Sequence, residues 1–168
     1  MCGGTSITEH LWDHRVRSDR EYPAHPLVGV GALIHDDEGR ILLIKRKFEP
    51  NKGRWSLPGG LLETGESLLD AGKREVREEL GAELDVERLF HVSEELIRDE
   101  AGRVRFHFIL IDFLASLDPP EAKIVLNEES ERFRWFRPED VAGLETTDNT
   151  RGIVEKYAKE RLRKQSLH

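Results

Sequence analysis

The chain has 168 residues, of which 38% are hydrophobic, and a formal net charge of −7. This length suits one domain with a hydrophobic core. The acidic balance, with Lys and Arg spread along the chain, argues against a nucleic-acid groove or an anionic membrane surface as the main partner. The single cysteine and the lack of a membrane-length apolar run or signal peptide favour a reducing cytoplasm. The histidines have no paired ligand spacing, which argues against a zinc site.

Residues 1–26 are predicted to form an N-terminal arm that precedes a single domain at 27–168. The arm mixes glycine, serine and charged residues, and it ends in the stiff, proline-containing segment 22–26. Such an arm either stays free or covers a partner subunit, so a homodimer is an open alternative.

Two strands are predicted next. Residues 28–34 alternate with the period of two that is typical of a strand, and 41–46 form an apolar run of the kind that is buried on both faces. Turn-forming residues occupy 36–39 between them. The sequence therefore predicts a β-hairpin ahead of the glycine-containing loop 58–65.

A helix is predicted to begin after this loop and to run from Ser67 to Leu80. Ser67 is a good N-cap with an acidic residue three positions later, and Gly81 stands where a helix ends in a left-handed residue. Apolar residues on one side are expected to dock the helix on the sheet: Leu69, Val76 and Leu80.

Three carboxylates, Glu75, Glu78 and Glu79, fall within roughly a 100° arc of this helix. Glu75 has no cation at helical spacing, so the repulsion among the three is expected to be uncompensated. Crowded carboxylates raise one another's pKa or bind a cation, and hard oxygen ligands favour Mg²⁺ or Mn²⁺. A solvated acidic face is the alternative. We favour the cation.

Further strands are predicted at 85–97 and 103–117, joined by a hairpin turn, and a short strand at 132–136. The last segment, 148–164, has the pattern of an amphipathic helix. Together these elements predict an α/β fold in which a mixed sheet has the helix that carries the carboxylates on one face and the C-terminal helix on the other, an α/β/α sandwich.

Residues 60–82 read Gly, five residues, Glu, seven residues, Arg-Glu-Val, one residue, Glu-Glu, one residue, Gly-Ala. This stretch resembles the complete signature of the Nudix hydrolases at every fixed position. The resemblance implies the same α/β/α sandwich, and a metal-dependent hydrolase of a nucleoside diphosphate that is linked to another group.

The resemblance also implies roles for particular residues. Glu75, Glu78 and Glu79 would hold divalent cations together with the carbonyl of Gly59. Arg74 would orient the helix carboxylates, and its i+4 spacing also allows an ion pair with Glu78.

Residues beside the signature are candidates for substrate binding. Gly59 and Gly60 let the backbone approach a ligand closely, although turn geometry alone also explains them. Arg46 and Arg54 are placed to meet phosphate oxygens, with simple solvation as the alternative.

Nudix family members often supply a further carboxylate from the loop before the strand at 132–136. The candidates by position are Glu128, Glu129 and Glu131, and no spacing rule chooses among them. We expect Glu129 to be the general base or an additional metal ligand.

ADP-ribose, cleaved to AMP and ribose 5-phosphate, is the first substrate expected, because the run 52–60 and Pro26 before the first strand are similar to ADP-ribose pyrophosphatases. One feature departs from those enzymes: many have a proline beyond the signature where this chain has Leu-Ile-Arg-Asp at 96–99. The alternatives are a nucleoside triphosphate pyrophosphatase and a hydrolase of dinucleoside polyphosphates or nucleotide sugars. A sensor that binds nucleotide without cleaving it is a remote alternative, because the signature is intact.

Overall fold

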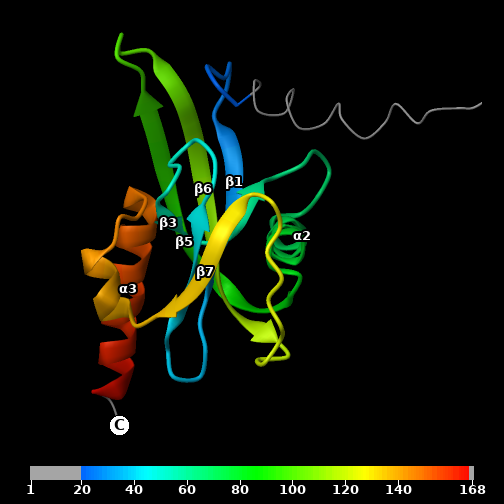
Figure 1. Cartoon of the computed structure of the whole chain (residues 1–168), viewed down its shortest axis with the longest axis vertical. Helices are drawn as coiled ribbons and strands as arrows, with labels where there is room; N and C mark the ends of the chain where they lie inside the picture. Colours follow the sequence, from blue (N-terminus) through cyan, green and yellow to red (C-terminus); the bar gives the residue numbers. More distant parts are fainter. Residues whose placement is uncertain (1–19, 167–168) are drawn as a thin grey trace, which may run out of the picture.

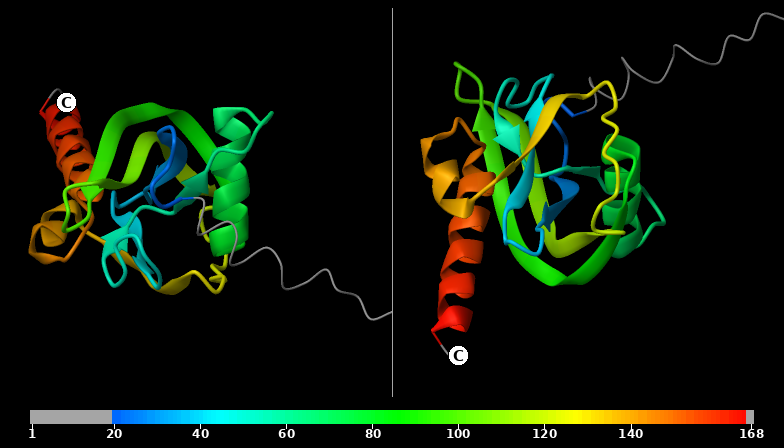
Figure 2. Two further views of the ribbon diagram at one scale, coloured as in Figure 1. Left: turned by 90° about the horizontal axis from the view of Figure 1, so that it is seen from above. Right: turned by 60° about the horizontal axis from the view of Figure 1, so that its bottom comes forward.

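The computed structural model describes residues 20–166, so residues 1–19 of the predicted arm lie outside the described residues. Two sheets lie between two helices, α2 and α3 (Figures 1 and 2), and this confirms the predicted α/β/α arrangement. In chain order the elements are β1 (Leu27–Ile34), β2 (Ile41–Arg46), β3 (Trp55–Ser56), β4 (Gly59–Leu61), α2 (Leu68–Leu80), β5 (Glu83–Arg98), β6 (Val104–Asp118), β7 (Ser130–Phe136), the 3₁₀ helix η1 (Pro138–Gly143) and α3 (Asp148–Gln165).

The larger sheet is mixed, as predicted, and has the strand order β4-β1-β6-β5. In it β1 runs parallel to β6 and antiparallel to β4, and β5 runs antiparallel to β6. The smaller sheet is antiparallel with the order β3-β2-β7. The predicted hairpin of residues 28–34 with 41–46 is wrong. Both edges of β1 are occupied by β4 and β6, so β2 joins the other sheet. An isolated bridge links Ile41 of β2 to His35, the residue that follows β1.

Strand β2 is buried on both faces, as its apolar run predicts, and its residues enter two hydrophobic clusters in alternation. Leu43 packs in the cluster that contains Ile153 of α3. Leu42 packs in the cluster that contains Val76 and Leu80 of α2. Each helix is therefore fixed to one side of the two sheets by its own apolar face (Figure 2).

Helix α2 begins and ends as predicted. The Ser67 hydroxyl accepts a hydrogen bond from a first-turn backbone N–H at 3.1 Å, and Gly81 is left-handed with φ of 63°. Its docking face differs in part from the prediction, since Leu69 is 42% exposed. The small residues Ala71 and Gly72 are buried instead, and a Cβ at Gly72 would lie 3.4 Å from side chains of the sheet. The helix backbone thus lies close to the strands.

The end of the predicted arm docks on the hairpin of β5 and β6. The backbone N–H of Tyr22 donates to the carbonyl of Arg105 at 2.8 Å, and the Tyr22 hydroxyl donates to Asp99 at 3.0 Å. Within residues 20–166, no helix is both long enough and apolar enough to cross a membrane.

Candidate active site

A cavity of about 610 Å³ opens between α2, the inner face of the larger sheet and the first turn of α3. It brings together most of the residues that the sequence singled out: Arg46, Gly59, Gly60, Arg74, Glu75, Glu78, Glu79 and Glu129. Arg54 does not line the cavity, and its Nη1 lies 3.5 Å from the carbonyl oxygen of Thr146.

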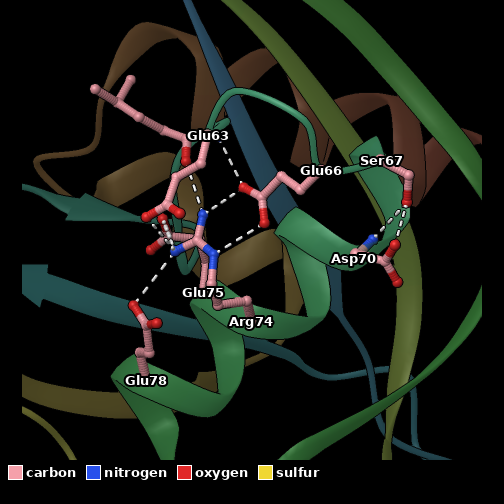
Figure 3. A network of polar contacts seen from close by, with 8 residues as sticks. Glu63, Glu66, Ser67, Asp70, Arg74, Glu75 and Glu78 are labelled. Carbon is pink, nitrogen blue, oxygen red and sulfur yellow. Dashed lines mark hydrogen bonds and ion pairs between the residues drawn. The ribbon is translucent and has the colours of Figure 1, made fainter.

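Arg74 lies at the centre of an acidic network (Figure 3). Its Nε and Nη2 donate to the two carboxylate oxygens of Glu66 at 3.0 and 2.6 Å, and Nη2 also donates to the carbonyl of Leu61 at 2.9 Å. Its Nη1 donates to Glu75 at 2.8 Å and to Glu78 at 3.3 Å. One side chain therefore ties β4 and the loop before α2 to the carboxylates of the helix.

The expectation that the repulsion around Glu75 is uncompensated is wrong. The cation comes from the adjacent residue, Arg74, because the long arginine side chain reaches across the helix surface instead of obeying helical spacing. The predicted i+4 ion pair of Arg74 with Glu78 is confirmed. The hydrogen bond between Arg74 and Glu66 raises the pKa of Arg74 and lowers the pKa of Glu66 from their ordinary values. This pair therefore stays charged.

Glu75 lies against the backbone of β4. A Cβ at Gly60 would lie 2.2 Å from Glu75 Oε2, so the glycine leaves the space that this carboxylate occupies. Burial raises the pKa of Glu75, the Arg74 guanidinium opposes that rise, and the charges of Glu78 and Glu129 add to it. Arg74 also pairs with Glu66 and Glu78, so the position holds more negative charge than one arginine offsets.

Glu79 has turned inward and is only 6% exposed. Its carboxylate accepts the backbone N–H of Gly59 at 3.1 Å and the hydroxyl of Ser130 at 2.8 Å. Burial raises the pKa of Glu79 to about 7, against the lowering effect of these two hydrogen bonds. Glu79 therefore joins the glycine loop to the start of β7, a role that Ser130 shares and that sequence reasoning missed.

Within the described chain, no group of three His, Cys, Asp or Glu side chains is already arranged to hold a metal ion. Arg74 contacts both Glu75 and Glu78, while Glu79 faces Gly59 and Ser130. The donor set still fits a hard divalent cation, because carboxylates and a backbone carbonyl are the ligands that Mg²⁺ and Mn²⁺ prefer. The excess negative charge beside Gly60 is the local feature that a cation would offset.

Of the three candidate carboxylates, Glu128 and Glu129 precede β7 whereas Glu131 lies within it. Glu129 lines the cavity, and Glu128 and Glu131 do not. Glu131 instead pairs with Arg132 at 2.6 Å. The charge of Glu129 raises the pKa of both Glu75 and Glu79, which places it electrostatically beside the helix carboxylates.

Sequence reasoning missed a second polar region of the cavity, around Asp112 of β6 and Asn149 of α3. Asp112 is 3% exposed, and burial raises its pKa to about 6 in spite of a hydrogen bond from Asn149. The available signal was an acidic residue at an inward-facing position of an otherwise apolar strand face, shared with Phe108 and Leu110.

Comparison with known proteins finds a family match over most of the chain. A family model described as NUDIX domain matches residues 25–157. An ADP-ribose pyrophosphatase of Methanocaldococcus jannaschii is 41% identical over 90 residues, which are 54% of this chain and 53% of that protein. The matched region thus spans about half of this relative.

Two further proteins match over a larger share of their length. The nucleoside triphosphatase NudI of Escherichia fergusonii is 32% identical over 124 residues, 71% of this chain and 87% of that protein. The solved structure of a MutT NUDIX hydrolase from Burkholderia pseudomallei is 36% identical with a TM-score of 0.65, and the match covers 79% of this chain and 98% of that one.

Proposed function

The chain belongs to the NUDIX family of hydrolases, which act on nucleoside diphosphate derivatives, and from this premise we propose that it cleaves ADP-ribose to AMP and ribose 5-phosphate. The observation that carries the proposal is the position of Glu75, Glu78 and Glu129 on one cavity of about 610 Å³, a size that suits a nucleotide derivative. The relative named ADP-ribose pyrophosphatase supports this choice of substrate.

We infer that the cavity uses Mg²⁺ or Mn²⁺, held by Glu75, Glu78 and Glu79 with the carbonyl of Gly59. When bound, such a cation would neutralise the diphosphate oxygens and stabilise the charge that develops during attack on phosphorus. Arg74 keeps Glu75 and Glu78 oriented, and its charge opposes the rise in the pKa of Glu75 that burial causes.

The remaining groups act on water and on phosphate. Glu129 is exposed at the cavity, and this supports the proposal that its carboxylate accepts the proton of an attacking water. Arg46 lines the same cavity, and its Nε donates to the carbonyl of Pro50 at 2.9 Å. Its charge also lowers the pKa of Glu79, a proposed metal ligand, and this supports a role for Arg46 in binding phosphate oxygens.

A second candidate is hydrolysis of nucleoside triphosphates. The observation in its favour is the match to NudI, which covers 87% of that protein, against 53% for the ADP-ribose pyrophosphatase. Both reactions break a phosphoanhydride and use the same acidic residues, so the cavity chemistry supports either one.

The test is a substrate panel with the full chain and Mg²⁺, in which products are separated by chromatography. The panel contains ADP-ribose, the four dNTPs, a diadenosine polyphosphate and NADH. We expect ADP-ribose to have the highest kcat/KM and to yield AMP and ribose 5-phosphate. Preferential release of nucleoside monophosphate from a dNTP would support the second candidate. Binding of ADP-ribose without turnover in Mg²⁺ or Mn²⁺ would contradict catalysis.

A further inference from the structure

A buried carboxylate lies in the cavity on β6, on a different element from the acidic residues of α2. Asp112 lines the cavity although it is only 3% exposed. It stands opposite Gly31 of β1, and a Cβ at Gly31 would lie 2.3 Å from Asp112 Oδ1. The glycine therefore leaves the space that the carboxylate occupies.

Two side chains orient this carboxylate. Asn149, in the first turn of α3, donates its Nδ2 to Asp112 Oδ2 at 3.3 Å. The hydroxyl of Ser93 on β5 donates to Asn149 Oδ1 at 2.5 Å, which keeps the amide nitrogen directed at Asp112. Asn149 thus bonds to Oδ2, while Oδ1 lies over Gly31, and both Gly31 and Asp112 line the cavity.

The position of Asp112 along the sheet indicates which part of a substrate it meets. Gly59, Gly31 and Asp112 stand in one row across β4, β1 and β6. Two strand spacings of about 4.8 Å place Asp112 roughly 10 Å from Gly59. The diphosphate would lie near Gly59, because the carbonyl of Gly59 is a proposed ligand of the cation that neutralises it.

Covalent bonds of about 1.3–1.5 Å put the edge of a nucleobase roughly 9–10 Å from the phosphorus of its 5′-phosphate, and the ribose hydroxyls at roughly 5–6 Å. The span to Asp112 therefore matches a base edge better than a sugar. A second phosphate is excluded there because Asp112 would repel it.

We propose that Asp112 accepts a hydrogen bond from the exocyclic amino group of the substrate's base and that Asn149 is a positioning residue for it. An ionised carboxylate only accepts hydrogen bonds, so it favours an amino group and disfavours a carbonyl oxygen at the same position. The identity of the base as adenine rests on the proposed function. Adenine and hypoxanthine differ at this atom, the first with an amino group and the second with a carbonyl oxygen.

The experiment compares kcat/KM for ADP-ribose and for its hypoxanthine analogue IDP-ribose, in the wild type and in Asp112→Asn. We expect the wild type to prefer adenine at least 10-fold, since a mismatched base leaves a buried polar group unpaired. In Asp112→Asn, the Asn149 amide still donates to the oxygen at position 112, which turns the new amide nitrogen toward the base. The preference should therefore fall at least 10-fold and move toward hypoxanthine.

Two variants separate this role from a structural one. Asp118→Asn changes an exposed carboxylate at the end of the same strand and should leave the adenine preference unchanged. Ser93→Ala frees the Asn149 amide and should weaken the preference with little change in kcat, as expected for a group that acts only through the orientation of Asp112.

The same ratios measured with dATP and dITP keep this proposal separate from the proposed function, because they test the base without the second ribose. If ADP-ribose is not cleaved but dATP is preferred over dITP in an Asp112-dependent way, the base contact stands and the ADP-ribose assignment fails. Equal kcat/KM on both bases in the wild type, or an unchanged ratio in a folded Asp112→Asn protein, would overturn the role of Asp112.

Discussion

Replacing Arg74 with glutamine is expected to destabilise the metal-free protein substantially. The Arg74 side chain is 21% exposed and the Glu75 side chain that it neutralises is 17% exposed. Removing one partner of a buried ion pair costs about 3–5 kcal/mol, because the other charge stays buried without compensation. The partial exposure of this pair reduces that figure to about 2 kcal/mol.

Arg77→Gln is the matched control, because it makes the same chemical change on the same helix. Arg77 pairs with Glu83, but these side chains are 56% and 51% exposed, so the pair is largely screened by solvent. The free energy of unfolding is measured for both variants by urea denaturation followed by circular dichroism. Added Mg²⁺ should restore part of the loss in Arg74→Gln, since a bound cation would again offset Glu75.

A loss in Arg74→Gln no larger than in Arg77→Gln would refute the reasoning. It would mean that the hydrogen bonds of Figure 3 do not compensate a buried charge. If Mg²⁺ reduced the loss of unfolding free energy, relative to the wild type, equally in the two variants, that would likewise contradict a cation at Glu75.

The remaining predictions concern the helix cap, a buried acid and the proposed base. Ser67→Ala should lower the unfolding free energy by about 1 kcal/mol through loss of the N-cap, and an unchanged urea midpoint would contradict this. The native state keeps a proton on Asp112 up to about pH 6, whereas the unfolded chain releases it near pH 4. The unfolding free energy of the metal-free protein should therefore fall by up to about 3 kcal/mol as the pH rises from about 4 to about 6. Asp112→Asn should remove that part of the pH dependence of urea unfolding. Glu129→Gln should lower kcat strongly at neutral pH with little change in KM, and higher pH should recover part of the rate as hydroxide replaces the base. Glu128→Gln and Glu131→Gln are its controls, and three active variants would move the base to the helix.

Features that depend on local sequence were predictable. The bounds of α2 follow from Ser67 and Gly81, which act on the backbone of their own turn. The α/β/α order follows from alternating apolar patterns along the chain, and the family follows from the unbroken signature at 60–82.

Features that depend on distant partners were not predictable. Strand β1 pairs with β6, whose partner residues lie about eighty positions away, and this pairing removes the expected hairpin. The reach of Arg74 to Glu75 depends on the path of one side chain and not on helix periodicity. The contact of Asp112 with Asn149 joins a strand to a helix that no local pattern connects.

The central claim, that the acidic face of α2 binds a divalent cation to hydrolyse a phosphoanhydride, is tested most directly by turnover under metal control. Initial rates are measured for the wild type and Glu78→Gln with Mg²⁺, with excess chelator, and after Mg²⁺ is restored. The Glu78 side chain is 57% exposed, so Glu78→Gln should keep the fold while kcat falls by orders of magnitude. The account predicts that wild-type turnover disappears on chelation and returns with Mg²⁺. Full turnover in excess chelator, or wild-type kcat in Glu78→Gln, would contradict it.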